Sequence, residues 1–229
     1  MKIYSYAELK KRHRQEGADF PRPVALRVHR ALSWLDCAEQ ASSLDEKFLF
    51  LWISSNSAYA ADLDSDADYE TKRFDTFPMR VVSRLKKASM ATIFRKRYPG
   101  PVCLLLDNQF AFKPFWDRQN SLIPDEQWTL HFKTEESTAN RALASQKTHK
   151  VLQLLFHRLY ALRNQLIHCG VAWGGEVNRS QIQNDSALLG EIVPLVTEIM
   201  VDNAPEDSIV PIYPVQLNFT HSKISEELG

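Results

Sequence analysis

The stretch LYALRNQLIHCG, residues 159–170, ends a long segment with the periodicity of an α-helix. Apolar residues recur along one face of this segment, and Gly170 follows as a helix stop signal. Arg163 has apolar residues one turn before it and one turn after it. A guanidinium keeps its proton, so among apolar neighbours it needs an anionic partner or a wet cleft. The stretch therefore predicts a functional site at the end of a helix.

The same kind of periodicity predicts helices elsewhere in the chain. The motif helix is expected to begin near Thr138 and to end at His168, and Pro194 is expected to kink the last helix or to lie in its first turn. Ser43–Glu46 has the pattern of a capping box that opens a strongly apolar, central helix. The other helices are predicted at 24–41, 47–60, 77–97 and 182–202.

The middle of the chain is harder to interpret. The Pro-Gly-Pro sequence at 99–101 predicts a break. Residues 102–117 are expected to form either a short buried helix or an irregular aromatic-rich segment, and residues 118–136 show no clear pattern. We therefore treat residues 62–136 as an insert in an otherwise helical chain.

The whole pattern predicts one all-α domain. Residues 1–22 are expected to be an N-terminal arm, either a lead-in helix or mobile, and residues 205–229 a C-terminal tail. Residues 23–204 form the predicted helical domain, with the insert between its second and penultimate long helices. The chain of 229 residues is long enough for one substantial core.

Composition excludes several classes of protein. No apolar run is long enough to cross a bilayer, and the first residues carry no apolar signal segment, so we expect a cytoplasmic protein. The 3 cysteines are far apart and form no CxxC pair, so neither a disulfide framework nor a metal site is predicted, and no cofactor is expected.

Charge is balanced overall but uneven along the chain. The net charge is +0, yet the segment 72–97 is strongly basic and follows an acidic stretch. A basic block is typical of surfaces that bind phosphate backbones, although a solvated helix face would look the same. We select Arg84, Lys86 and Lys87 from this block as candidate substrate-binding residues. Asn56 is a further candidate, because an amide in an apolar helix is either a structural tether or a site residue.

The spacing of Arg163 and His168 carries a geometric consequence. Five residues on an ideal helix correspond to a rotation of about 140° and a rise of about 7.5 Å. The two side chains therefore converge only if the helix loosens at its end, or if a second copy of the helix contributes across a two-fold interface. Asn164 and His168 are four residues apart and share a face, so Asn164 is expected to orient the imidazole.

The string Arg163-Asn-Gln-Leu-Ile-His168 resembles the R-N-x-x-x-H motif of the HEPN superfamily. It lies late in a long helix and is followed by a glycine, a tryptophan-containing loop and a closing helix. The string FLFLWISSNSAY, residues 48–59, is similar to the second helix of one HEPN subgroup. The resemblance covers roughly residues 24–61 and 138–204, and the insert falls outside it. Cys169 replaces a glycine that is common in similar proteins.

The resemblance implies a helical bundle that dimerises so that two motif helices meet in a cleft. Many HEPN proteins are metal-independent endoribonucleases that act in toxin–antitoxin pairs or in phage defence. Carried over, Arg163 and His168 are the catalytic pair and Asn164 is the polar residue of the motif. The implied partners are RNA, a second copy of the chain and an antitoxin or defence-system protein. The alternative is a catalytically silent HEPN module that binds RNA, nucleotide or a protein.

The chemistry of these residue types fits RNA cleavage. Attack by the ribose 2′-OH needs a group that transfers protons near neutral pH, as histidine does, and a cation that stabilises the crowded phosphorane. We expect products with 2′,3′-cyclic phosphate ends. A structural interpretation remains open: His168 compensates the helix dipole, and Arg163 belongs to an ion pair with Glu46 or an acid of the last helix.

Overall fold

The computed structural model describes residues 5–59, 99–168, 170–176 and 179–206. These residues form helices joined by short connections, and no strand occurs among them. The predicted all-α class is therefore confirmed for the described part of the chain. The predicted helix at 77–97 and the C-terminal tail from residue 207 lie outside the described residues.

The chain divides into two compact units. The N-terminal unit comprises residues 1–69 together with 189–229, and the central unit comprises residues 70–188. Both boundaries fall inside the predicted domain 23–204, and the last long helix, α10 (Arg179–Asp202), contributes to both units.

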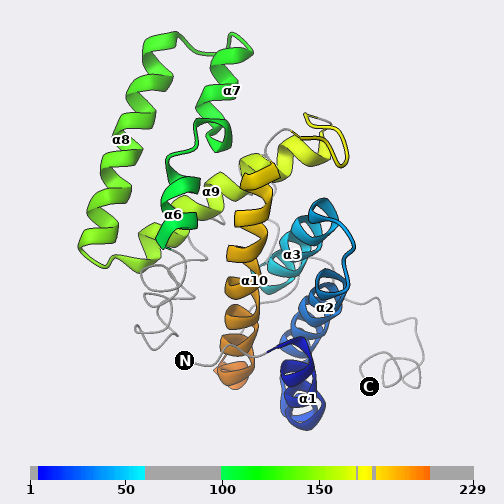
Figure 1. Ribbon diagram of the computed structural model, residues 1–229. Coiled ribbons are helices and arrows are strands. Elements are labelled where there is room, and N and C mark those ends of the chain that lie inside the picture. The colour runs from blue at the N-terminus through cyan, green and yellow to red at the C-terminus, as the bar shows by residue number, and fades with distance from the viewer. Residues whose placement is uncertain (1–4, 60–98, 169, 177–178, 207–229) are drawn as a thin grey trace. The chain divides into compact units, whose positions relative to one another are not determined.

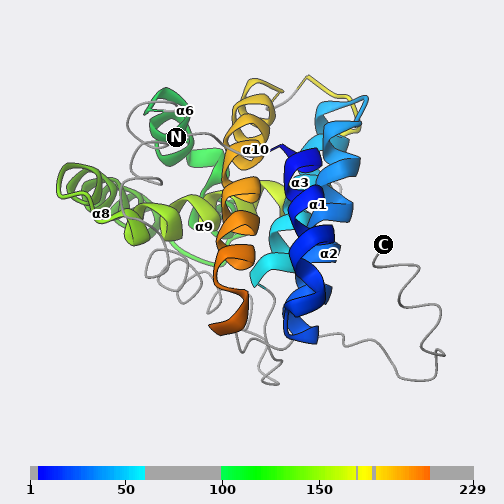
Figure 2. The ribbon, with the colours of Figure 1, turned by 90° about the horizontal axis from the view of Figure 1, so that it is seen from below.

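Three helices open the N-terminal unit and lie side by side (Figures 1 and 2). They are α1 (Tyr6–Glu16), α2 (Arg22–Glu39) and α3 (Leu44–Tyr59). A capping box closes the start of α1, where Ser5 N donates to Glu8 Oε2 at 2.9 Å and Glu8 N donates to Ser5 Oγ at 3.4 Å. Leu9 is fully buried, so the N-terminal segment is a packed helix and the mobile-arm alternative is wrong.

The predicted capping box before α3 is confirmed. Ser43 N donates to Glu46 Oε2 at 3.0 Å, and Glu46 N donates to Ser43 Oγ at 3.1 Å. The helix it opens is central to the core, since Phe48, Leu51 and Trp52 are buried. Buried polar contacts fix α3 on α2: Ser54 Oγ donates to the Ala31 carbonyl at 2.6 Å, and Arg27 donates to the Ala58 carbonyl.

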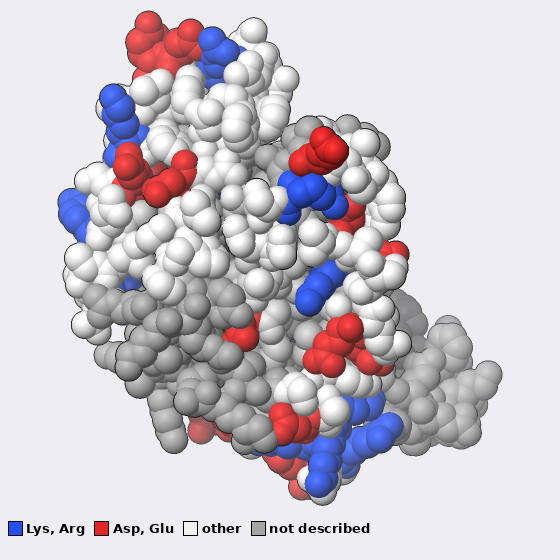
Figure 3. Space-filling model, viewed as in Figure 1, with Lys and Arg blue, Asp and Glu red and all other residues white. Residues whose placement is uncertain are grey.

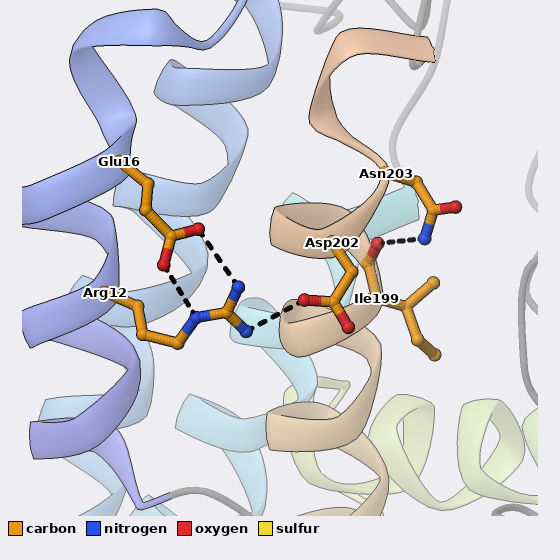
Figure 4. A network of polar contacts seen from close by, with 5 residues as sticks. All are labelled: Arg12, Glu16, Ile199, Asp202 and Asn203. Atoms are coloured by element: carbon orange, nitrogen blue, oxygen red, sulfur yellow. Dashed lines mark hydrogen bonds and ion pairs between the residues drawn. The ribbon is translucent and has the colours of Figure 1, made fainter.

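An ion-pair network ties α1 to the end of α10 (Figure 4). Arg12 Nε lies 2.9 Å from Glu16 Oε1, and Arg12 Nη1 lies 2.9 Å from Asp202 Oδ1. The hydrogen bonds that Arg12 donates to Glu16 and its contact with Asp202 raise the pKa of Arg12. One guanidinium thus joins residues that are far apart in the sequence.

The central unit contains the predicted insert and the motif helix. Its helices are α6 (Pro99–Leu106), α7 (Lys113–Gln119), α8 (Asp125–Ala144) and α9 (Thr148–Ile167), with a short 3₁₀ helix, η3 (Gln109–Ala111), before α7. The prolines at 99 and 101 lie in the first turn of α6, where their missing N–H groups cost little, so they begin a helix here. Figure 1 shows α7 and α8 side by side.

One segment of this region that the sequence leaves open is helical, and one prediction is wrong. Residues 125–136, which show no clear pattern in the sequence, belong to a 20-residue helix. The segment from Thr138 to His168 is two helices, because α8 ends at Ala144 and α9 begins at Thr148. Gln146 adopts a φ of 57° in the intervening turn, and Lys147 N donates to Ala142 O at 2.9 Å. This is a Schellman motif with glutamine in the position that usually holds glycine.

The motif helix α9 packs as its periodicity predicts. Leu152, Leu155, Leu159 and Leu162 are buried, and only the last residue of the predicted stripe, Leu166, is half-exposed. Pro194 lies inside α10, in the portion that belongs to the N-terminal unit, and not in the first turn of the helix. No helix in the described part of the chain is both long enough and apolar enough to cross a membrane.

Candidate functional site

The candidate site lies at the C-terminal end of α9. The helix stays regular through Ile167, and His168 is its C-cap residue, whose N–H donates to Asn164 O at 2.9 Å. Gly170 N then donates to Gln165 O at 2.7 Å, which closes the turn. A Cβ on Gly170 would lie 3.2 Å from that oxygen, closer than most Cβ contacts, so glycine fits this turn better than a larger residue.

The helix end does not loosen in a way that would bring Arg163 and His168 together. Because the main-chain hydrogen bond at His168 is retained, the two residues keep a separation of about 140° around the axis. The Arg163 guanidinium also lies toward the preceding turn, with Cζ 5.8 Å from the centre of the Tyr160 ring. Within one chain the structure therefore keeps the cation and the imidazole apart.

Asn164 connects the two candidate residues through different atoms. Its amide oxygen accepts a hydrogen bond from Arg163 Nη1 at 2.8 Å, whereas its main-chain oxygen accepts from the His168 N–H. We expected the amide to orient the imidazole; among the described residues it instead positions the guanidinium. The His168 side chain is exposed.

Arg163 retains unused hydrogen-bonding capacity. Its side chain is partly buried, and its Nε is buried without a hydrogen-bond partner among the described residues. No salt bridge joins it to a carboxylate within the described part of its unit. Because an unpaired guanidinium in partly apolar surroundings favours an anion, this end of α9 is suited to bind a phosphate.

Gln165 lies within the motif but is not among the site residues predicted from the sequence. Its side-chain Nε2 donates to the Phe110 carbonyl at 2.6 Å, and its own main-chain oxygen accepts from Gly170. The residue thus holds the end of α9 against η3 and also closes the turn after His168. Its partner is a main-chain oxygen 55 residues away, so no side-chain pattern could have indicated this contact.

The other predicted site residues are not brought to this place by any described contact. Asn56 lies on α3 in the N-terminal unit and is partly exposed. Arg84, Lys86 and Lys87 lie outside the described residues, as does Cys169. On the face drawn in Figure 3, the lysines and arginines of the described residues form small separate groups and no broad basic field.

A second polar cluster lies near the start of α10. Asn108 Nδ2 donates to Gln181 Oε1 at 3.0 Å, and Gln181 Nε2 donates to both carboxylate oxygens of Asp185 at 2.8 Å and 2.9 Å. Asp185 is fully buried. Burial raises its pKa from 3.8 to about 7, and the hydrogen bond from Gln181 only partly offsets that effect.

We expect Asp185→Asn to stabilise the protein at pH 8 by about 1–2 kcal/mol. The folded protein holds the Asp185 proton more tightly than the unfolded chain, so this group's contribution to stability falls as the pH rises from 3.8 to about 7. The rise of about three units in the pKa of Asp185 corresponds to about 4 kcal/mol of unfolding free energy at high pH. Asparagine loses one of the two hydrogen bonds that Gln181 donates, so the expected gain is smaller than this value.

Urea unfolding at pH 5 and pH 8 measures this effect. The variant should gain at pH 8 and lose its advantage at pH 5, where Asp185 in the wild type is protonated. Glu136→Gln, an exposed residue of α8, is a control for carboxylate removal alone. Equal changes at both pH values would contradict the expectation.

In the described part of the chain, no cluster of three or more His, Cys, Asp or Glu side chains could hold a metal ion.

Comparison of the chain with family models, curated proteins and solved structures returned no match.

Proposed function

We propose that this chain is a metal-independent endoribonuclease of the HEPN type, active as a homodimer. The observation that supports it best is the end of α9, where Arg163, whose guanidinium forms no ion pair within the described part of its unit, and the exposed His168 lie before and after Asn164. A cation and a proton-transfer group are the two requirements for cleavage of RNA by its own 2′-OH.

In the proposed reaction the ribose 2′-oxygen attacks the adjacent phosphorus and the 5′-oxygen of the next nucleotide leaves. The 2′-OH loses its proton to a base, and the leaving oxygen gains one from an acid. A two-fold dimer builds two equivalent sites, and in each of them one His168 takes the proton of the 2′-OH while solvent water supplies the proton to the leaving oxygen. Arg163 stabilises the charge on the phosphorane, and Asn164 holds the guanidinium in place. The products are a 2′,3′-cyclic phosphate and a 5′-OH.

The requirement for a 2′-OH selects RNA over DNA. The biological setting that we propose, a toxin or a phage-defence nuclease with a protein antagonist, rests on the resemblance of the motif alone. The proposal that Arg84, Lys86 and Lys87 contact RNA rests on the basic block of the sequence, and the proposal that Asn56 is a site residue rests on its place in an apolar helix.

The experiment is incubation of the purified protein with mixed RNA in EDTA. We expect the wild type to produce fragments with 2′,3′-cyclic phosphate ends, identified by mass spectrometry. His168→Ala is expected to lower the rate by at least about a hundredfold. His131→Ala, an exposed histidine on α8, is the matched control and should cleave like the wild type.

Two results would reject the proposal. Cleavage that is equal in the wild type and in His168→Ala would come from a contaminating nuclease. A protein that binds RNA without cutting it would be the silent module, the alternative that the resemblance leaves open.

A further inference from the structure

Two aromatic side chains near the motif are exposed although they are held in place. Phe110 of η3 is 43% exposed and Trp116 of α7 is 36% exposed. Trp116 Nε1 donates to the Phe110 carbonyl at 2.7 Å, and both rings make edge contacts with Phe115 at centroid distances of 5.3 Å. We call Phe110 and Trp116 the aromatic pair. It is fixed before any ligand arrives, so ordering it on binding costs little.

The position of the aromatic pair relative to the motif follows from one contact. The Phe110 carbonyl, which accepts from Trp116, also accepts from Gln165 Nε2 at 2.6 Å. On a regular helix Gln165 lies about 60° from His168 around the axis but about 160° from Arg163. The aromatic pair therefore lies on the His168 side of α9.

The opposite side of the helix end has its own exposed apolar residue. Ile167 is 47% exposed and lies about 40° from Arg163 around the axis. A second copy of the chain that brings its motif to this helix would cover Ile167 and Arg163. The aromatic pair, on the other side, is left for another occupant.

We propose that the aromatic pair stacks on an unpaired base of single-stranded RNA, next to the phosphate that is cleaved at His168. This inference rests on the proposed function and adds that the substrate is unpaired RNA. Aromatic rings bind bases of any sequence through their π faces, but only where the base is not already stacked in a duplex.

The charges around the aromatic pair favour a base over a phosphate. Lys113 Nζ is paired with Asp117 at 2.7 Å, and the Arg118 guanidinium is paired with Asp125. The short helix that carries Trp116 thus offers no uncompensated cation to a phosphate backbone. What it offers to a ligand is ring surface.

The test uses the full-length protein in a His168→Ala background, so that bound RNA stays intact. Binding of a short labelled oligouridylate is measured by fluorescence anisotropy. Phe110→Leu keeps an apolar side chain but removes the π face, and it is expected to weaken binding about tenfold. Leu130→Ala removes an exposed leucine of α8, 64% exposed, and should leave binding unchanged. A fully paired RNA hairpin should bind the parent and Phe110→Leu equally.

The outcomes separate this inference from the proposed function. If the wild type cleaves RNA and Phe110→Leu binds oligouridylate as well as its parent does, the stacking role is rejected and the nuclease stands. If Phe110→Leu turns a dimer into a monomer by light scattering, the aromatic pair is a protein interface, which also rejects stacking. If the wild type neither cleaves nor binds RNA, both fail. Thermal unfolding of Phe110→Leu confirms that a weaker complex does not reflect a misfolded protein.

Discussion

Mixed dimers of Arg163→Ala and His168→Ala are expected to cleave RNA, although neither variant does so alone. Each substitution by itself should lower the rate by at least about a hundredfold, because it removes either the phosphorane cation or the proton-transfer group from every site. In the mixed dimer one chain still supplies Arg163 and the other supplies His168. A site built across two chains is then complete once per dimer.

The reason for this expectation is the regular end of α9. The main-chain hydrogen bond from His168 to Asn164 is intact, so one helix holds the two residues about 140° apart. The Arg163 guanidinium lies over Tyr160, which precedes it by one turn of the helix. A partner helix can place its own histidine beside this arginine without any change in either helix.

The experiment co-expresses the two variants with different affinity tags and purifies the mixed dimer through both tags. We expect about half of the wild-type activity, since one of two equivalent sites survives. The matched control is a dimer of one Arg163→Ala chain and one chain that carries both Arg163→Ala and His168→Ala. This dimer has no Arg163 in either chain and should be inactive. An inactive mixed dimer beside an active wild type would show that the site lies within one chain.

The positions of α2, α3 and α10 and the buried face of the motif helix could be predicted from the sequence, whereas α8 could not. The capping box at Ser43–Glu46 and the leucine stripe of α9 are local patterns, and both are confirmed. The break between α8 and α9 could not be predicted, because Gln146 adopts a left-handed conformation that sequence rules assign to glycine or asparagine. The contact between Gln165 and the Phe110 carbonyl could not be predicted either, because every residue has a main-chain carbonyl and no residue type marks this acceptor.

The pattern that predicts a site residue at Arg163 also occurs at Arg158 of the same helix. An arginine with apolar residues one turn away on both sides is expected to be buried in an ion pair or to belong to a functional site. On this ground the sequence predicts Arg163 to be a site residue. Arg158 satisfies the pattern better, because Leu154, Leu155 and Leu162 are all buried around it. The structure shows Arg158 to be 1% exposed, so the strongest example of the pattern is a structural ion pair.

Glu135→Gln is expected to destabilise the protein by about 2–3 kcal/mol, whereas Arg158→Met should cost less than about 1 kcal/mol. Arg158 Nη2 lies 3.0 Å from Glu135 Oε1, and its Cζ lies 4.2 Å from the centre of the Phe112 ring and 5.2 Å from that of Phe132. Burial lowers the pKa of Arg158 to about 10 in spite of the nearby carboxylate. The folded state therefore holds this charge at a cost that Glu135 only partly offsets.

The asymmetry between the two variants follows from what each one leaves behind. Glu135→Gln removes the larger compensating charge and leaves a buried cation whose Nε and Nη1 lack hydrogen-bond partners among the described residues. The 3.0 Å contact is close enough for an ion pair, but Glu135 Oε1 receives no well-directed hydrogen bond, so we attribute its effect to charge. Arg158→Met places a flexible apolar chain beside the Phe112 and Phe132 rings and removes the buried charge altogether. Glu135 is 23% exposed, which keeps the expected loss below that of a fully buried pair.

Urea unfolding of both single variants and of the double variant measures the coupling between the two residues. The double variant should be about as stable as Arg158→Met, because a glutamine opposite a methionine leaves no buried charge. Glu136→Gln, an exposed neighbour on α8, is the control for loss of a carboxylate and should change stability by less than about 0.5 kcal/mol. A larger loss of stability in Arg158→Met than in Glu135→Gln would contradict this expectation. It would mean that the contacts of the guanidinium with Phe112 and Phe132 stabilise the protein by more than the burial of its charge costs.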